Sequence, residues 1–336
     1  MERSYASRVS EALTAERVGE LFDELLPAHG PVRAVSRFAE GSVTGAYRIE
    51  FARADSAPAV LKIYGTDSLP YAAKEARALS FLTDHGIGIS PRVLAFSRSA
   101  PALDGRPCVV SSLRPGRTLT ALDEELTPAQ HHEVYRQLGQ VLGRLHAVPA
   151  HGYGYVNGEI RDPLPDNRAH MARTFERELR RFRHHGGDPA LADRLAAHVA
   201  EHASAFAACS RPAYCHGDVH EPNLLVQLAH DGTCSLTGLL DPANLHAADP
   251  LMDFVRLDAF SMNGDATKIA GLLSGYGVSA AGQQPGQWPE AWRSRLPLYR
   301  IALALELYNW FTITGQTSLL PALDRDLRRL LGEPGP

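Results

Sequence analysis

The stretch AYCHGDVHEPNLLV, residues 213–226, holds the polar cluster from which the rest of this sequence can be interpreted. Apolar residues lie at both ends of the stretch. Five polar side chains lie in the short turn between them: His216, Asp218, His220, Glu221 and Asn223. A turn with a purely structural role has little reason to collect such groups. The stretch is therefore either a solvated turn or an active-site loop, and the surrounding sequence bears on the choice.

A hairpin follows the turn and ends at a second aspartate. The runs NLLVQL and SLTGLLD are typical of short strands, and HDGT between them predicts the connecting turn. We therefore expect Asp218, Asn223 and Asp241 to converge at one end of the hairpin. Carboxylate and carboxamide oxygens suit Mg²⁺ better than zinc. The pattern indicates a site that handles phosphate groups.

Phosphoryl transfer also needs a cation on the nucleotide phosphates and a base that positions the acceptor hydroxyl. Only three of the 336 residues are lysines, and one of them, Lys62, lies within the strand-like run AVLKIYG. Taken alone, a lysine in mid-strand is more often solvated, but its scarcity here favours a binding role. Glu75, in the predicted helix that follows, is a candidate partner, whereas Lys74 beside it is expected to be solvated. Solvated or turn roles for Glu75 and Asp241 stay open at this point.

The chain divides into two parts with different patterns. Up to residue 113, strand-like runs surround a predicted helix at residues 71–86. The remainder is mostly helical, with helices predicted at 127–148, 191–208 and 289–314. A hinge is expected between residues 113 and 120. The sequence thus predicts an α+β fold with two lobes, residues 1–113 and 114–336.

Composition narrows the possible partners. The net charge of −4 and the absence of a basic run argue against a nucleic-acid or acidic-membrane partner. The four cysteines form no CxxC pair, so neither a zinc knuckle nor a redox dithiol is indicated. The N-terminus lacks an apolar signal region, and the most hydrophobic segment is interrupted by Arg300 and Glu306. We expect a cytoplasmic protein that is a monomer or a weak homodimer.

Together these residues resemble the aminoglycoside phosphotransferase family, a branch of the protein-kinase-like fold that phosphorylates small molecules. The resemblance extends from about residue 33 to residue 258 and includes AADPLMDF after the second aspartate. Its specific part is HGD-x4-N followed by an aspartate at a strand end. It implies a bilobal fold that uses Mg²⁺ and takes ATP or GTP as the phosphoryl donor.

The resemblance implies a role for each matching residue. Asp218 corresponds to the catalytic aspartate, and Asn223 and Asp241 to the magnesium ligands. Lys62 corresponds to the lysine on the nucleotide phosphates, with Glu75 as its ion-pair partner.

Two further segments are expected to bind the nucleotide. The turn at residues 40–45, with Gly41 and Ser42, would cover the phosphates. Ser111 and Leu113 would offer backbone hydrogen bonds to the base. The hinge SS at residues 111–112 lacks the acidic and aromatic pair often found there, so the resemblance does not distinguish ATP from GTP.

The acceptor pocket should draw on residues 150–190 and on the helices after residue 249. Candidate contacts are Tyr153, Tyr155, Glu159 and Asp249. Asp249 is also expected to brace the catalytic loop or to cap the next helix. The aromatic residues Tyr308, Trp310 and Phe311 are expected in the core.

The acceptor itself is the least defined part of the prediction. A polycationic aminoglycoside would need many carboxylates, whereas residues 173–183 are rich in arginine. We therefore expect a hydroxyl on a sugar- or nucleoside-containing antibiotic, with a resistance role. Metabolite kinases that act on homoserine, choline or fructosamine-like alcohols are alternatives within the family, because fold does not fix function.

Two other classes remain open. His216, Asp218 and His220, with His246 and Asp249, could be ligands of a transition metal in a hydrolase. That interpretation gives Lys62 and Asn223 no role. A nucleotide-binding pseudoenzyme is the third class, although every expected catalytic group is retained.

Overall fold

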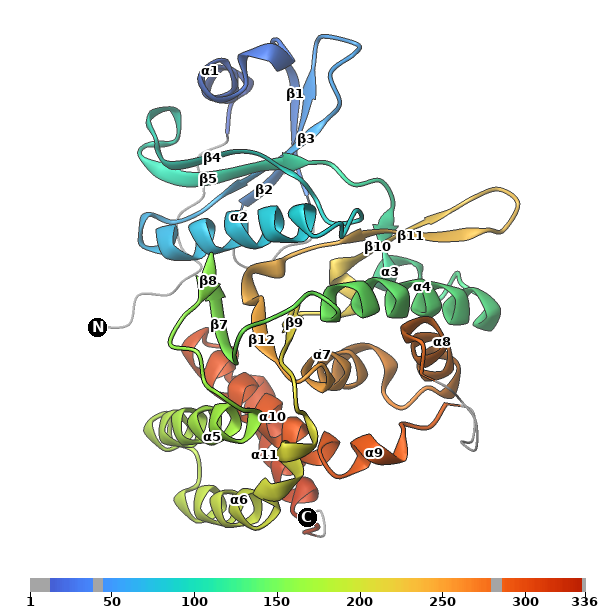
Figure 1. The fold of residues 1–336 in the computed structure, drawn as a ribbon. Coiled ribbons are helices and arrows are strands. Elements are labelled where there is room, and N and C mark those ends of the chain that lie inside the picture. Colours follow the sequence, from blue (N-terminus) through green and yellow to red (C-terminus); the bar gives the residue numbers. More distant parts are fainter. Residues whose placement is uncertain (1–12, 39–44, 279–285, 334–336) are drawn as a thin grey trace.

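The computed structural model describes residues 13–38, 45–278 and 286–333. The N-terminal part is built on an antiparallel sheet with the strand order β1-β2-β3-β5-β4 (Figure 1). Its strands are β1 Val32–Arg37, β2 Gly45–Phe51, β3 Ala59–Ile63, β4 Val93–Ala100 and β5 Arg106–Ser112. Helix α1, Ala15–Leu25, packs on one face of this sheet, and α2, Leu69–Asp84, packs on the other.

The alternation of strand β3 explains where Lys62 points. Leu61 and Ile63 are buried in the cluster beneath α1. Because successive side chains of a strand point to opposite faces, Lys62 projects to the α2 side of the sheet. There it meets Glu75, which α2 carries on its buried face.

The larger C-terminal part is mostly helical. Its helices are α3 Leu119–Leu122, α4 Pro128–His146, α5 Asn167–His184, α6 Pro189–His202, α7 Leu251–Leu257, α8 Ala266–Tyr276, α9 Glu290–Arg293, α10 Leu296–Ile313 and α11 Leu320–Leu330. A π-helical segment, Asp258–Met262, continues α7. The predicted cap at Thr127 is confirmed: Thr127 and Gln130 form a capping box at the start of α4.

Two small sheets hold the loops between these helices. Their strands are β6 Arg117–Thr118, β7 Gly154–Asn157, β8 Glu159–Ile160, β9 Ala213–Cys215, β10 Leu224–Leu228, β11 Cys234–Leu239 and β12 His246–Ala248. One sheet has the order β11-β10-β6 and the other the order β8-β7-β12-β9. The predicted hairpin is β10–β11, and the stretch at residues 213–226 runs from β9 into β10.

Two predicted helices differ from the structure, one by a break and one by an earlier end. The helix predicted at 289–314 is divided into α9 and α10. At the break, the side chain of Arg295 forms a buried ion pair with Asp249. The helix predicted at 191–208 ends at His202 and continues as a 3-10 turn, Ala203–Ala208. Trp310 was expected in the core but is 44% exposed, whereas Tyr308 is buried.

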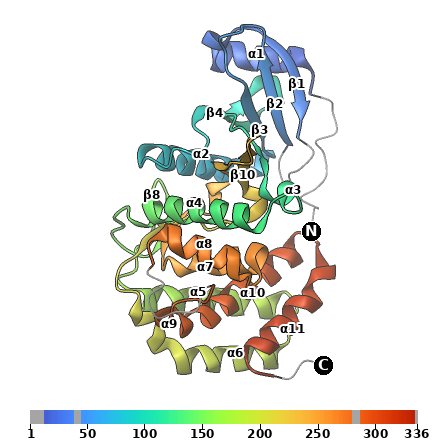
Figure 2. The same cartoon turned by 90° about the vertical axis from the view of Figure 1, so that its right-hand side faces the viewer.

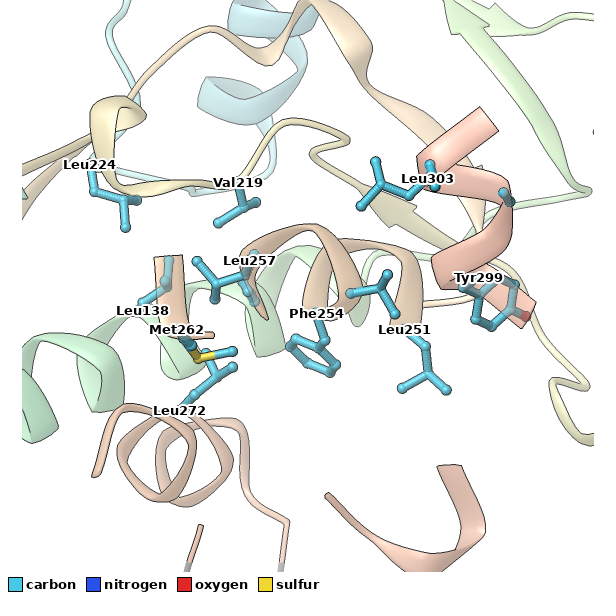
Figure 3. Packing of buried hydrophobic residues seen from close by; sticks show 14 of the residues in the cluster. Leu138, Val219, Leu224, Leu251, Phe254, Leu257, Met262, Leu272, Tyr299 and Leu303 are labelled. Atoms are coloured by element: carbon cyan, nitrogen blue, oxygen red, sulfur yellow. The ribbon is translucent and has the colours of Figure 1, made fainter. Parts of the chain in front are cut away.

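The main core surrounds α7 (Figure 3). Phe254, Leu251 and Leu257 project from this helix into the cluster, and Val219 of the loop between β9 and β10 points toward Leu257. Val219 and Leu224 are fully buried. The apolar residues of the stretch at 213–226 thus fix the loop to the core, and its polar residues are held at the edge of that core.

Helices α4 and α8 lie against each other (Figure 2). A side chain at Gly275 would place its Cβ 1.8 Å from the carbonyl oxygen of Arg136, and one at Gly139 would lie 2.2 Å from that of Leu272. Only glycine allows this spacing, because the two backbones meet where a Cβ would be. The close crossing positions α8 next to the loop between β9 and β10.

The predicted α+β architecture, a sheet-based N-terminal part followed by a mainly helical part, is confirmed. The boundary predicted at residue 113 falls between β5 and β6 and stays a prediction. Among the described helices, none has the length and apolar character needed to span a membrane.

Candidate active site

The loop between β9 and β10 is braced from below by a buried carboxylate. Asp253 of α7 accepts hydrogen bonds from the backbone N–H of His216 at 2.9 Å and of Gly217 at 2.8 Å. His146 of α4 lies 3.0 Å from the same carboxylate. Burial raises the pKa of Asp253, but His146 and the N–H groups outweigh it and lower the pKa to about 2. A permanent negative charge therefore holds the loop.

Gly217 makes the sharp turn that presents Asp218. Its φ of +79° lies in the left-handed region, and an added Cβ would lie 2.4 Å from the carbonyl oxygen of Asn244. The imidazole of His216 is fully buried, and its Nδ1 accepts from the backbone N–H of Asp218 at 3.3 Å. His216 shapes the loop from inside and does not face an open site.

The carboxylate of Asp218 lies at the edge of the core between two polar partners. Nδ2 of Asn223 donates to its Oδ2 at 3.2 Å, and Nη1 of Arg256 lies 3.3 Å from its Oδ1. Burial would raise the pKa of Asp218, but a hydrogen bond from His220 and the charge of Arg256 lower it overall. Asp218 is therefore ionised at neutral pH, and each of its two carboxylate oxygens is held by a partner.

A second buried cluster supports the loop through Glu221. Lys268 of α8 donates to Glu221 at 2.8 Å and lies 3.1 Å from Asp123. Tyr135 of α4 donates to the same Glu221 oxygen at 2.7 Å. The Glu221 backbone N–H in turn donates to Ser261 at 2.9 Å, in the π-helical segment. The close pair α4–α8 thus clamps the C-terminal half of the loop.

The hairpin brings the two predicted metal ligands together. The backbone N–H of Leu240 donates to the carbonyl of Asn223 at 2.9 Å, so Leu240 lies across from Asn223 and Asp241 is the next residue. Asp241 has the left-handed conformation, with φ +57°, and its side chain is 42% exposed. Nδ2 of Asn223 donates to Asp218, and this leaves Oδ1 of Asn223 as the oxygen available to a metal. Together with the carboxylate of Asp241 it provides hard oxygen donors of the kind that fit Mg²⁺.

Lys62 connects the two parts of the molecule. Its ammonium donates to Glu75 at 2.7 Å and also bonds to Asp241. Tyr64 donates to the other oxygen of Glu75. Burial would lower the pKa of Lys62, but the two carboxylates outweigh it and raise the pKa. The predicted pairing of Lys62 with Glu75 is therefore present.

Of the other four predicted nucleotide contacts, the structure describes Ser111 and Leu113. Gly41 and Ser42 lie outside the described residues. Ser111 is buried in β5 between Val60 of β3 and Val93 of β4. Leu113 follows the strand, and its N–H lies 3.4 Å from the carbonyl of Pro58. Both backbone positions lie at the end of β5, where the sheet passes to the C-terminal part.

A pocket lies next to the catalytic loop in the C-terminal part. It comprises about 740 Å³ of space that includes open solvent, and it is lined by β7, α5, β12, α7 and α10 together with Gly217 of the loop between β9 and β10. Tyr155, half-exposed, lies in its wall with Arg256 and Glu306. Arg256 reaches both Asp218 and, at 2.8 Å, Glu306. One guanidinium thus joins the pocket to the loop between β9 and β10.

Of the four predicted acceptor contacts, the structure places one in this pocket. Tyr155 lines it. Tyr153 is buried and donates to the carbonyl of Cys209 at 3.0 Å. Asp249 is buried, bonded to Arg295 and Tyr299, and accepts from the N–H of Leu251 at 3.0 Å.

These contacts give Asp249 the predicted helix-capping role, and the bracing role belongs to Asp253, one helical turn later. Glu159 is exposed in β8 and is not among the lining residues. Lys74 was expected to be solvated but is only partly exposed, and its ammonium lies 5.4 Å from the centre of the Tyr155 ring. Burial lowers the pKa of Lys74.

The residues of the alternative hydrolase do not form a metal site. His220 lies 3.7 Å from Asp218, but Nδ1 of His216 faces the loop backbone and Nδ1 of His246 faces the carbonyl of Asn244. Asp249 is engaged by Arg295. Within the described ranges, the one compact group of potential ligands is His146, Cys215 and Asp253, whose carboxylate is already bound to the loop backbone.

The sequence pattern did not single out four residues of this site: Arg256, Asp253, Lys268 and the pocket residue His170. It singled out Glu221 as part of the polar cluster and His246 as a hydrolase ligand, but it did not predict the contact of Glu221 with Lys268 or the place of His246 in the pocket. One signal was available for Lys268. It is one of three lysines, and all three have an ammonium partly or largely buried against carboxylates or an aromatic ring.

Comparison with known proteins agrees with this geometry. Residues 35–295 match the model of the phosphotransferase enzyme family. A thermostable mutant of aminoglycoside phosphotransferase APH(4)-Ia, in ternary complex with AMP-PNP and hygromycin B, superposes with a TM-score of 0.68 at 15% identity, covering 95% of this chain and 98% of that one.

The GDP complex of aminoglycoside 2'-phosphotransferase-IIIa is also similar, with a TM-score of 0.66 at 14% identity over 95% of this chain and 99% of that one. At these identities the likeness shows the fold, which confirms the predicted bilobal protein-kinase-like architecture. Because the family model covers most of the sequence, the chain belongs to the phosphotransferase enzyme family.

Proposed function

We propose that the protein transfers the γ-phosphoryl group of ATP or GTP to a hydroxyl of a small molecule. The observation that carries the proposal is the assembly of Asp218, Asn223, Asp241 and the Lys62–Glu75 pair around one point where the two lobes meet. A phosphotransferase needs these groups together, and a structural loop does not.

Asp218 is the proposed base. It accepts the proton of the acceptor hydroxyl as that oxygen bonds to the γ-phosphorus and the bond to the β–γ bridging oxygen breaks. Its pKa is low, so it is a weak base. That suits a loose transition state, in which the proton leaves late and orientation matters more than basicity. The hydrogen bonds from Asn223 and Arg256 fix the carboxylate for that purpose.

Asn223 and Asp241 are the proposed holders of Mg²⁺, through Oδ1 of the amide and the carboxylate. When bound, the ion neutralises charge on the nucleotide phosphates. Lys62 contributes a fixed positive charge on the same side, and Glu75 and Tyr64 fix its position. Such preorganised charges stabilise the transition state without reorganisation during the reaction.

The proposed acceptor site is the pocket beneath Gly217. It contacts the residue that precedes Asp218 in the loop, and Arg256 lies in its wall. The position supports a sugar- or nucleoside-containing antibiotic as acceptor, with a resistance role, or a metabolite alcohol in a kinase of the same fold. A cytoplasmic, monomeric or weakly dimeric enzyme is part of this proposal.

The test is nucleotide binding followed by product analysis. Isothermal titration with ATP and GTP, with and without Mg²⁺, should show nucleotide binding that requires the ion. Mass spectrometry of a mixed alcohol panel should then show a product heavier by one phosphoryl group. Absence of nucleotide binding in the presence of Mg²⁺ would reject the function.

A further inference from the structure

The positive charges of the proposed acceptor pocket come from three elements. Arg177 of α5 and Arg256 of α7 line it, and Lys74 of α2 lies beside its wall. The guanidinium of Arg177 lies 5.2 Å from the centre of the Tyr155 ring, and the ammonium of Lys74 lies 5.4 Å from it. Two cations therefore gather at the half-exposed ring of Tyr155.

The negative charges near the pocket are already paired. Glu306, the carboxylate in its lining, accepts from Arg256 at 2.8 Å. Asp218 lies 3.3 Å from the same guanidinium. Glu178, behind the wall, accepts from Nε of Arg177 at 2.6 Å. A ligand with several ammonium groups would meet cations at the ring and would have to displace guanidinium groups to reach a carboxylate.

Two imidazoles supply the neutral polar groups of the pocket. His170 of α5 is 7% exposed and lines the pocket. Burial lowers its pKa to about 3. His246 of β12 faces the carbonyl of Asn244 with Nδ1 at 2.8 Å, while its buried Nε2 has no partner among the described residues. Burial also lowers the pKa of His246.

Because His170 and His246 are neutral, they can accept hydrogen bonds from a ligand. A neutral imidazole keeps one nitrogen as a hydrogen-bond acceptor, and for His246 the contact with Asn244 makes Nε2 that nitrogen. Leaving a buried acceptor without a donor costs free energy. A ligand that donates O–H or N–H groups here would recover that cost, without bringing a charge into the pocket.

On the premise of the kinase function proposed above, we propose that the acceptor is an uncharged, polyhydroxylated or amide-bearing alcohol. His170 and His246 recognise its donor groups, and Arg177, Arg256 and Lys74 disfavour polycationic amino sugars. The substrate class thus differs from the polycationic one that an aminoglycoside represents.

The test compares ligands that differ in charge on one scaffold. Hygromycin B and its fully N-acetylated form, together with a set of uncharged nucleosides and glycosides, are titrated into the full-length protein with AMP-PNP and Mg²⁺. Acetylation removes positive charge and replaces ammonium groups with neutral amides. We expect at least one uncharged ligand to bind about tenfold or more tightly than hygromycin B, a difference of ~1.4 kcal/mol.

A charge-reversal pair tests the pocket itself. Arg177→Glu should strengthen binding of hygromycin B by about tenfold, since it places a carboxylate beside Tyr155. Arg180→Glu makes the same charge change on the exposed side of α5 and should have no such effect. Arg177→Gln should give an intermediate gain, and it keeps the test valid if the reversed charge unfolds the protein.

Three results would overturn the proposal. The first is tighter binding of hygromycin B than of every uncharged ligand to the unmodified protein. The second is the absence of binding by any uncharged ligand while AMP-PNP is bound. The third is an equal effect of the Arg177 and Arg180 variants. Failure of AMP-PNP itself to bind is a separate result, and it would reject the kinase function rather than the substrate class.

Discussion

The ammonium of Lys62 bonds to the carboxylate of Asp241, although the two residues are 179 positions apart in the sequence. Lys62 lies on the N-terminal sheet and Asp241 follows the hairpin of the C-terminal part. The contact therefore places the proposed phosphate-binding cation next to the proposed metal ligand. The same contact holds the two lobes together at the residues that would bind the nucleotide phosphates and Mg²⁺.

Lys62→Ala should reduce kcat strongly while the acceptor KM stays within about twofold, because the lost charge acts mainly in the transition state. The change also leaves Glu75 buried without its cation, so the free energy of unfolding should fall by about 3 kcal/mol. Steady-state kinetics and urea unfolding measure the two effects. Lys62→Arg keeps the charge and should lose less stability. Unchanged kinetics in the alanine variant would leave Lys62 with a structural role only.

Asp241→Asn should abolish the dependence of nucleotide affinity on Mg²⁺, because the carboxylate is the stronger of the two proposed oxygen ligands. Isothermal titration of ATP with and without the ion makes the comparison. Asp231→Asn is the matched control: it removes one charge from the exposed turn of the same hairpin. An Asp241 variant that still requires Mg²⁺ to the same extent would contradict the metal assignment.

Lys268→Met should destabilise the fold by about 3 kcal/mol, because Glu221 then remains buried without its cation. The catalytic loop carries Glu221, so kcat should fall as well, with the nucleotide Kd nearly unchanged. Lys268→Arg should recover most of both losses. Denaturant unfolding and single-turnover rates separate the two effects. If kcat survived in a folded Lys268→Met protein, the α4–α8 clamp would not position the loop.

The burial of His170 predicts a pH dependence of stability. Its pKa is lowered to about 3 in the folded state by burial, from an ordinary value near 6.5. Between these values the unfolded chain binds the extra proton, so stability is full above pH 6.5 and is lost as pH falls toward 3. The slope from this group is at most about 1.4 kcal/mol per pH unit.

His170→Gln removes the titrating group. Between pH 6.5 and 4, the unfolding free energy of the variant should therefore fall less than that of the unmodified protein. Chemical unfolding at several pH values gives the comparison. Identical pH slopes for the two proteins would show that His170 is not held neutral by burial.

Much of the site could be predicted because its residues are close in sequence or follow a strong local pattern. Asp218 and Asn223 lie in one loop, Asp241 ends the second strand of a two-strand hairpin, and Lys62 follows the alternation of β3. These relations depend on local periodicity and turn chemistry, which sequence carries directly.

The supporting residues depend on contacts between distant segments, which local patterns do not specify. Lys268 reaches Glu221 only because glycines let α8 approach α4, and Arg256 reaches Asp218 because α7 passes beneath the loop. Asp249 and Asp253 are one helical turn apart in AADPLMDF, and the direction of α7 decides which of them faces the loop. The boundary between α9 and α10 likewise coincides with a tertiary ion pair at Arg295.

The central claim is that Asp218 is the base of a phosphoryl transfer, and one comparison tests it most directly. The unmodified protein and Asp218→Asn are incubated with Mg²⁺, ATP or GTP, and the same panel of antibiotic and metabolite alcohols. Products are then quantified by mass spectrometry.

We predict a product heavier by one phosphoryl group with the unmodified protein. For Asp218→Asn we predict a rate lower by about 10³-fold at unchanged nucleotide affinity, because the variant loses both the base and the charge that orients the hydroxyl. Equal product from both proteins, in samples where each binds nucleotide, would contradict the account.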